Sequence, residues 1–215
     1  MKAYTERGAL VLADISGFTE FVTRTELEHG PPIIAELLEA VMRELSPPME
    51  IQEVEADAIF ALGPDRTLMP PGRLLDALDR AFAAFRHRQL EMQADESCSC
   101  RVCRSVAQLA LKIVAHHGSF LRHVVGGHPQ VAGTDVILAH RLLKNGLGLG
   151  RAYLMVTEAA LRWLEIEPNR IGLAPRTERY DHLGDVRCFV KPMPDEALTL
   201  DLRSGRISEP APAAA

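Results

Sequence analysis

The feature that most constrains this chain is an apolar run near its start that stops at an acid and a glycine. Residues 8–14 read GALVLAD, and Ser16-Gly17 follow. A short apolar run bounded by turn-forming residues predicts a buried β-strand. From Phe18 onward, apolar residues recur at helical spacing until Gly30. The chain therefore begins with a strand, a turn and a helix, and Asp14 lies where the strand emerges.

The rest of the chain alternates predicted helices and strands, with no internal repeat and no linker. Further helices are predicted after Pro31-Pro32, over 72–92, over 134–144 and in the TEAALRWLEI segment, and strands at 49–54, 57–62, on both sides of a Gly118-Ser119 turn, at 153–156 and around a Gly184-Asp185 turn. This order favours one α/β (α+β) sandwich over residues 1–192. We expect a cysteine-rich insertion loop at about 93–105 and a partly disordered C-terminal extension over 193–215.

Composition excludes several classes of partner. The formal charge is −5, from 24 Lys+Arg against 29 Asp+Glu, whereas nucleic-acid and anionic-membrane binders are usually basic. No apolar stretch approaches the roughly 18 residues that span a bilayer, and the N-terminus lacks a signal peptide's apolar core. The four cysteines are unevenly placed, which is typical of a reducing compartment. We expect a cytoplasmic protein with no nucleic-acid or membrane partner.

Two aspartates lie at predicted strand ends. Asp14 follows the first strand, and Asp57 lies at the turn of the next strand pair. Carboxylates from neighbouring strands can share divalent ions in the two-metal manner. The alternative is that each aspartate only caps a turn, as this residue type often does. The residue types alone leave both interpretations open.

Four short motifs occur in order along the chain. Residues 12–19 read LADISGFT, residues 55–58 read EADA, residues 111–118 read LKIVAHHG, and residues 133–142 read GTDVILAHRL. Together they resemble the signatures of class III adenylate/guanylate cyclase catalytic domains over residues 8–190. With its Cys-x-Cys-x-x-Cys insertion, the chain resembles a divergent bacterial branch of that superfamily. The resemblance implies a cyclase-like sandwich with a ferredoxin-like core, a mostly antiparallel sheet and packed helices.

The resemblance also implies a metal and phosphate site. In the family, two aspartates, which match Asp14 and Asp57, hold two Mg²⁺ or Mn²⁺ ions, and the carbonyl matching Ile15 is a third ligand. Backbone N–H groups of the residues matching Gly17, Phe18 and Thr19 face the triphosphate. Family members complete their sites in a homodimer, so a homodimer and a nucleoside triphosphate are the implied partners.

The second half of the family machinery is incomplete. Arg141 matches the arginine that stabilises phosphate charge, but Ile137 stands where an asparagine orients the ribose. The base-selecting lysine is absent, and its region carries Glu53 and Glu55. Asp135 is the candidate for a second base-selecting position. The metal half is therefore present, while the transition-state half is damaged.

The cysteine loop offers a second kind of chemistry. Cys98, Cys100 and Cys103 supply three thiols within one turn-rich loop, which is one ligand short of a usual Zn²⁺ site. A fourth ligand can come from Cys188, from His116 or His117, or from a second subunit. The competing interpretation is a redox-inert or disulfide-prone loop. Since His116 and His117 alternate along a predicted strand, we expect one packed and one exposed imidazole.

Three functions follow from these features. The leading hypothesis is a divergent cyclase-homology protein that binds divalent metal and a nucleoside triphosphate, has a regulatory or sensory role in signalling, and shows little ordinary cyclase activity. The first alternative is an active nucleotidyl cyclase that converts ATP to cyclic AMP and pyrophosphate. The second is a metal- or redox-responsive protein that uses the cysteine loop.

Overall fold

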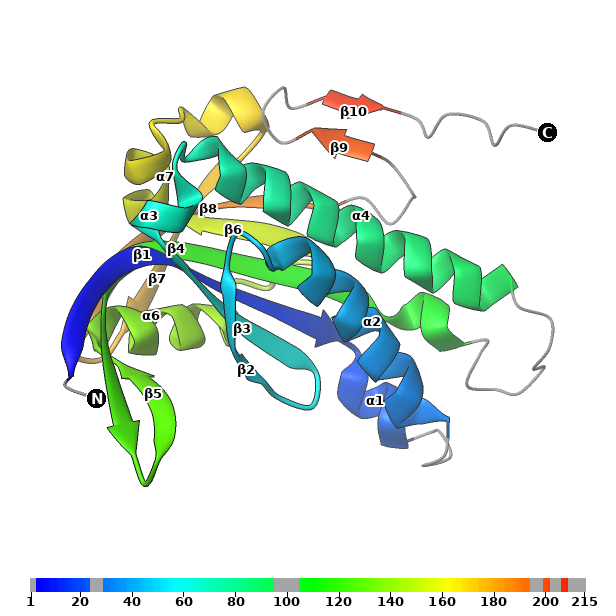
Figure 1. Ribbon diagram of the computed structural model, residues 1–215. Helices are drawn as coiled ribbons and strands as arrows, with labels where there is room; N and C mark the ends of the chain where they lie inside the picture. The colour runs from blue at the N-terminus through cyan, green and yellow to red at the C-terminus, as the bar shows by residue number, and fades with distance from the viewer. Residues whose placement is uncertain (1–2, 24–28, 95–104, 194–198, 202–205, 209–215) are drawn as a thin grey trace.

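A twisted eight-stranded sheet forms the centre of the computed structural model, which describes residues 3–23, 29–94, 105–193, 199–201 and 206–208 (Figure 1). The strand order is β2-β3-β1-β4-β6-β8-β7, and β5 pairs with β4. These strands are β1 (Tyr4–Ser16), β2 (Glu50–Val54), β3 (Ala58–Pro64), β4 (Ala110–Val125), β5 (His128–Ala132), β6 (Tyr153–Thr157), β7 (Ala174–Tyr180) and β8 (Gly184–Pro192). β4 and β6 pair in parallel and the other pairs are antiparallel. The predicted mostly antiparallel sheet is confirmed.

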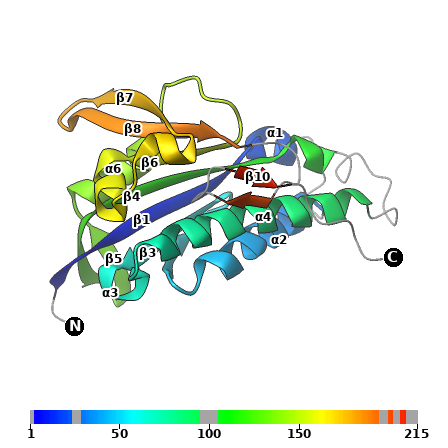
Figure 2. The ribbon, with the colours of Figure 1, turned by 90° about the horizontal axis from the view of Figure 1, so that it is seen from above.

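Helices cover both faces of this sheet. Those described are α1 (Phe18–Thr23), α2 (Gly30–Leu45), α3 (Asp65–Leu68), α4 (Gly72–Ala94), α6 (Thr134–Leu143) and α7 (Glu158–Leu164), with 3₁₀ turns η1 (Val106–Gln108) and η2 (Pro168–Ile171). α2 and α4 lie side by side on one face (Figure 2), where α7 adds to the same core. α6 packs on the opposite face over a smaller core. Sheet and helices together form the expected α/β sandwich.

The central strand β1 divides its side chains between these two cores. Val11 and Ala13 face the α2–α4 core, whereas Leu10 and Leu12 face the α6 core. Alternation of this kind follows from the two-residue period of a strand, and burial on both faces explains the continuous apolar run. Asp14 continues the row of Leu10 and Leu12, so it lies on the α6 side of the sheet.

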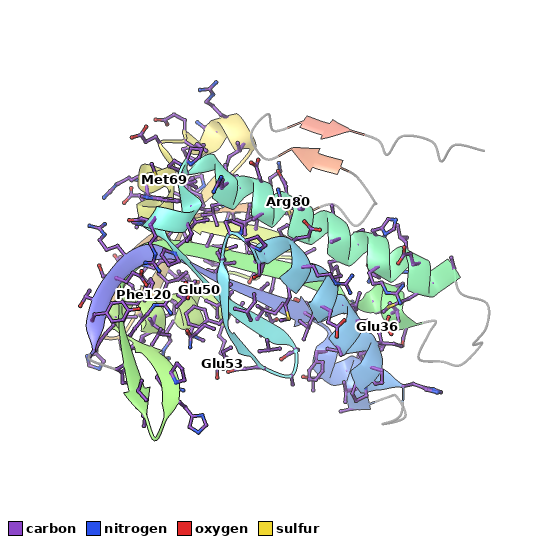
Figure 3. The ribbon with its side chains drawn as sticks, in the orientation of Figure 1. Glu36, Glu50, Glu53, Met69, Arg80 and Phe120 are labelled. Atoms are coloured by element: carbon purple, nitrogen blue, oxygen red, sulfur yellow. The ribbon has the colours of Figure 1, made fainter. Side chains whose placement is uncertain are left out.

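The pair α2–α4 is held by apolar burial and by ion pairs along its outer edge. The Arg80 side chain donates to Glu44 at 2.9 Å, and Arg88 pairs with Glu36 about two turns of α2 away (Figure 3 labels Arg80 and Glu36). Exposed pairs of this kind contribute little, so the buried apolar stripes supply most of the stability. The helix predicted over 72–92 is confirmed as α4.

A buried glutamine fixes the start of β4. Gln89 of α4 donates from Nε2 to the carbonyls of Val106 and Leu109, each at 2.7 Å. Because the Gln89 side chain is almost fully buried, its amide needs partners inside the protein, and these two carbonyls supply them. The α4 helix therefore anchors the 3₁₀ turn η1, which directly precedes β4.

Two expectations about the 110–125 segment are wrong. β4 runs unbroken through Gly118-Ser119, and the chain reverses instead at Gly126 and Gly127, both of which have positive φ. Gly118 is required for a different reason, since a Cβ there would lie 2.3 Å from an Asp135 carboxylate oxygen.

The neighbouring histidines are also not one packed and one exposed residue. His116 and His117 are both buried, because helices cover both faces of β4. His116 contacts Asp135 and Thr157 on one face. His117 contacts Asp65 and stacks on Trp163 on the other, with ring centroids 4.8 Å apart.

In the C-terminal extension the structure describes two short paired strands, β9 (Thr199–Asp201) and β10 (Arg206–Ser208). The predicted cysteine loop falls mostly in 95–104, outside the described residues. Among the helices of the described ranges, none combines the length and the apolar character needed to cross a bilayer.

Candidate functional site

A cleft of about 620 Å³ opens at the end of β1, between the β2–β3 hairpin and α6. One wall is acidic, with Asp14 from β1 and Glu53, Glu55 and Asp57 from the hairpin (Glu53 is labelled in Figure 3). The α6 side carries His140, Arg141 and Lys144. Apolar side chains complete the lining, together with Tyr180: Leu12, Ala58, Phe60, Val136, Ile137 and Leu143.

The hairpin is tied to β1 so that the two predicted metal ligands line one cleft. The Ile15 N–H donates to the carbonyl of Asp57 at 2.9 Å, and Asp14 pairs in register with Ala58. Burial, and next the Asp14 carboxylate, raise the pKa of Asp57 above its ordinary value. A cation near Asp57 would favour its ionised form, because opposite charge opposes both causes.

The donor set suits a hard divalent cation. Carboxylate oxygens are the ligands that Mg²⁺ prefers, and this ion usually keeps several waters or takes phosphate oxygens besides one or two carboxylates. Asp14 and Asp57 provide that number of carboxylates. In the described ranges no three His, Cys, Asp or Glu side chains are grouped closely enough to hold a metal by themselves. Backbone, water or ligand oxygens would therefore complete the coordination.

Lys112 is the residue that the sequence patterns missed. It lies directly beside Asp14 in the β1–β4 ladder, and its Nζ is 2.8 Å from Asp14 Oδ2. Both side chains are largely buried, 22% exposed for Lys112 and 15% for Asp14. The available signal was a single lysine inside the apolar strand LALKIVAHH, where a charge needs a partner.

The α6 wall carries Arg141, the predicted phosphate-contacting residue, and Ile137, which stands at the position of the family's asparagine. Arg141 lines the cleft, and its backbone carbonyl accepts a hydrogen bond from the Tyr180 hydroxyl at 3.0 Å. Ile137, one helical turn earlier, also lines the cleft and is 55% exposed. An exposed isoleucine at this place presents a methyl surface where a hydrogen-bonding amide stands in the resembled family.

The remaining predicted nucleotide residues do not line this cleft. The Asp135 carboxylate accepts the Ser119 N–H at 2.7 Å and contacts His116 at 3.2 Å. Gly17 has φ +90°, and a Cβ there would meet the Arg151 guanidinium at 2.2 Å. Phe18 lies in a separate apolar groove against α2, and Thr19 is exposed on α1. A nucleotide role for these four residues stays a prediction.

The possible zinc ligands Cys98, Cys100 and Cys103 lie outside the described residues. Cys188 is fully buried in β8, and burial first, then the Glu178 charge, raise the pKa of its thiol to about 11. A thiol of this kind is protonated near neutral pH, whereas zinc binds the thiolate. His116 and His117 are each engaged with an aspartate. Cys188 is therefore buried as a thiol, and His116 and His117 already have aspartate partners, so none of the three is presented as a free fourth ligand for zinc.

Comparison with solved structures identifies the fold. The adenylyl cyclase CyaB from P. aeruginosa matches with a TM-score of 0.66 at 13% identity, covering 90% of this chain and 98% of that one. The guanylyl cyclase Cya2 matches at 0.60 and 17%, covering 88% and 93%. The guanylate cyclase domain of RhGC from Catenaria anguillulae, solved in complex with GTP, matches at 0.62 and 14%, covering 88% and 97%. The chain has the fold of class III cyclase catalytic domains.

Comparison of sequences identifies the family. "Uncharacterized protein Rv2561/Rv2562" of Mycobacterium tuberculosis is 29% identical over 154 residues, which cover 71% of this chain and 69% of that protein. The family model described as "Protein of unknown function (DUF2652)" matches residues 34–149, more than half of the chain. That segment includes the β2–β3 hairpin, Lys112 and all of α6. The chain is therefore a member of the DUF2652 family, built on a cyclase-like fold.

Proposed function

We propose that this chain binds a divalent cation, Mg²⁺ or Mn²⁺, between Asp14 and Asp57, together with a nucleoside triphosphate. The observation that carries the proposal is the two-sided charge of one cleft. Carboxylates line its β1 and hairpin side, and Arg141 and Lys144 line its α6 side. A metal–polyphosphate complex has matching polarity, since its cation suits the acids and its phosphate oxygens suit the bases.

Each wall has a separate task in this proposal. Asp14 and Asp57 would hold the cation, with the Ile15 carbonyl as a further oxygen donor, and the cation would draw in phosphate despite the acidic surroundings. Arg141 would contact phosphate oxygens through its planar guanidinium, for which bidentate contacts are common. That one fold neighbour was solved with GTP supports a nucleotide as the ligand class.

The same geometry favours binding over turnover. Catalysis requires contacts that strengthen in the transition state, and Ile137 cannot donate or accept a hydrogen bond there. We therefore propose a regulatory or sensory role, in which the bound nucleotide changes the state of the protein. A homodimer belongs to the proposal, and one fold neighbour is described as a non-canonical dimeric guanylyl cyclase domain.

An active nucleotidyl cyclase is the second candidate. It is favoured by one observation, the presence of Arg141 in the same cleft as both aspartates. The metal- or redox-responsive alternative depends on Cys98, Cys100 and Cys103, and metal analysis of protein purified without chelators tests it.

The deciding experiment measures nucleotide binding and product formation in one preparation. We expect ATP or GTP to bind by calorimetry with Mn²⁺ present and to form little cyclic nucleotide. Asp14→Asn and Asp57→Asn should abolish the Mn²⁺-dependent part. Asp185→Asn, on an exposed β7–β8 position, is the matched control and should bind as wild type does. Robust product that Asp57→Asn abolishes would establish the second candidate, and absence of nucleotide binding would reject both.

A further inference from the structure

The ion pair between Lys112 and Asp14 joins two neighbouring strands, and its carboxylate partner, Asp14, lines the cleft of the proposed site. Their Cα positions face each other across the β1–β4 ladder, so the ammonium and carboxylate meet without any distortion of the backbone. Nζ lies 2.8 Å from Oδ2, which is the distance of a charge-assisted hydrogen bond. The Lys112 ammonium thus contacts a carboxylate oxygen that a cation would use.

A divalent cation and an ammonium compete for that oxygen. Like charges repel strongly in a partly buried site, where water screens them less than at the surface. Asp57 adds one acid to the pair, and Glu53 and Glu55 line the cleft farther along the hairpin. A cation that binds Asp14 and Asp57 must therefore share Asp14 with the lysine or displace it.

We propose that Lys112 is a built-in counter-ion that makes this site select a metal–polyphosphate complex over the free metal. The proposal rests on the proposed function, because it assigns the cation to Asp14 and Asp57. When free metal binds, the ammonium loses its contact with Asp14 and gains no new partner, which weakens the binding of free metal. When phosphate arrives with the metal, the flexible lysine stem lets the displaced ammonium contact a phosphate oxygen. Metal and polyphosphate then bind cooperatively.

The test compares Mn²⁺ titrations of the full chain without and with inorganic tripolyphosphate. Lys112→Met removes the counter-ion, so we expect free Mn²⁺ to bind about tenfold more tightly. For each protein, the preference is the affinity for Mn²⁺–tripolyphosphate divided by the affinity for free Mn²⁺. We expect this preference to be about tenfold smaller in Lys112→Met than in wild type. An ion pair with only a structural role would change the affinity for both ligands alike and would leave their ratio unchanged.

Two further variants keep the test sharp. Arg43→Met removes an equal charge from an exposed position of α2 that does not line the cleft, and it should leave free Mn²⁺ binding within about twofold of wild type. Lys112→Arg keeps the cation and should bind free Mn²⁺ no better than wild type. If Lys112→Met does not fold, Lys112→Gln replaces it, with circular dichroism as the check.

The outcomes separate the two proposals. If Lys112→Met and wild type bind free Mn²⁺ equally, or if Arg43→Met gains as much affinity as Lys112→Met, the counter-ion proposal is wrong while the metal site survives. If neither wild type nor any variant binds Mn²⁺, with or without tripolyphosphate, the proposed function itself fails.

Discussion

The carboxylate of Asp135 lies against Gly118, where it would be 2.3 Å from a Cβ on that residue, and it accepts the N–H of Ser119 at 2.7 Å. The first turn of α6 is thereby fixed to the middle of β4. The Cβ and Cγ of Asp135 would also lie within 3 Å of the added carbon, so a rotation of the carboxylate alone cannot relieve the clash.

Gly118→Ala should therefore lower the free energy of unfolding by about 1–3 kcal/mol, as overpacking does elsewhere. Urea unfolding followed by fluorescence of the single tryptophan measures this change. Gly146→Ala is the matched control, because no atom lies within 4 Å of its added carbon. The control should leave stability unchanged or slightly higher. Equal stability of Gly118→Ala and wild type would contradict the packing argument.

The buried imidazole of His116 predicts a pH dependence of stability. Burial lowers its pKa below the ordinary value of 6.5, and this effect outweighs the Asp135 carboxylate, which favours the charged ring; His117 lowers the pKa further. The unfolded chain then binds a proton on this ring at a higher pH than the folded chain. The stability that the neutral ring contributes is fully present above about pH 6.5. It is lost as the pH falls from there through the lower pKa of the folded state.

His116→Gln cannot titrate, so it isolates this contribution. Its free energy of unfolding should lie below that of wild type at pH 7.5, and the gap between the two proteins should be smaller at pH 5.5. Urea unfolding of both proteins at the two pH values measures the gap. A constant or widening gap would show that His116 is not kept neutral by the fold.

The exposed side chain of Ile137 predicts a gain of function under the proposed assignment. Ile137→Asn supplies an amide inside the cleft, one turn before Arg141. Because Ile137 is 55% exposed, the substitution should cost less than about 1 kcal/mol of stability. We expect cyclic nucleotide formation to rise about tenfold or more, since a single well-placed donor has a large effect on such reactions.

Chromatographic detection of cyclic product after incubation with ATP or GTP and Mn²⁺ measures that gain. Val125→Asn makes the same kind of change at a residue that is 59% exposed and does not line the cleft, and it should leave product unchanged. Adding Asp57→Asn to Ile137→Asn should remove the gain. If Ile137→Asn forms no more product than wild type, the missing amide does not limit the reaction.

The sequence predicts correctly those helices and strands that are determined by neighbouring residues in the chain. The strand over 8–14 and the helix over 72–92 were readable because periodicity and turn residues mark them, and both are present as β1 and α4. The predicted break of the strand at Gly118 was wrong, because that glycine accommodates Asp135 from another element. A glycine required by a tertiary contact looks the same in sequence as one required by a turn.

The candidate site divides in the same way. Asp14, Asp57 and Arg141 were found through motifs, and the structure brings all three to one cleft. Lys112 was missed because its meaning depends on β1–β4 pairing, and nothing in LALKIVAHH states which residue faces it. Asp135 was singled out through the cyclase resemblance, and in the structure its carboxylate contacts Ser119 and His116.

The β1–β4 ladder, which aligns Asp14 with Lys112, also sets the order in which this chain must assemble. It pairs residues about a hundred positions apart, from Tyr4 with Arg122 to Ser16 with Ala110, so the cost of closing so long a loop comes before its contacts form. The β2–β3 hairpin and the helices α2 and α4 are contained within that loop. Folding should therefore be slow for the size of the domain, and the cleft should be among the last parts to form.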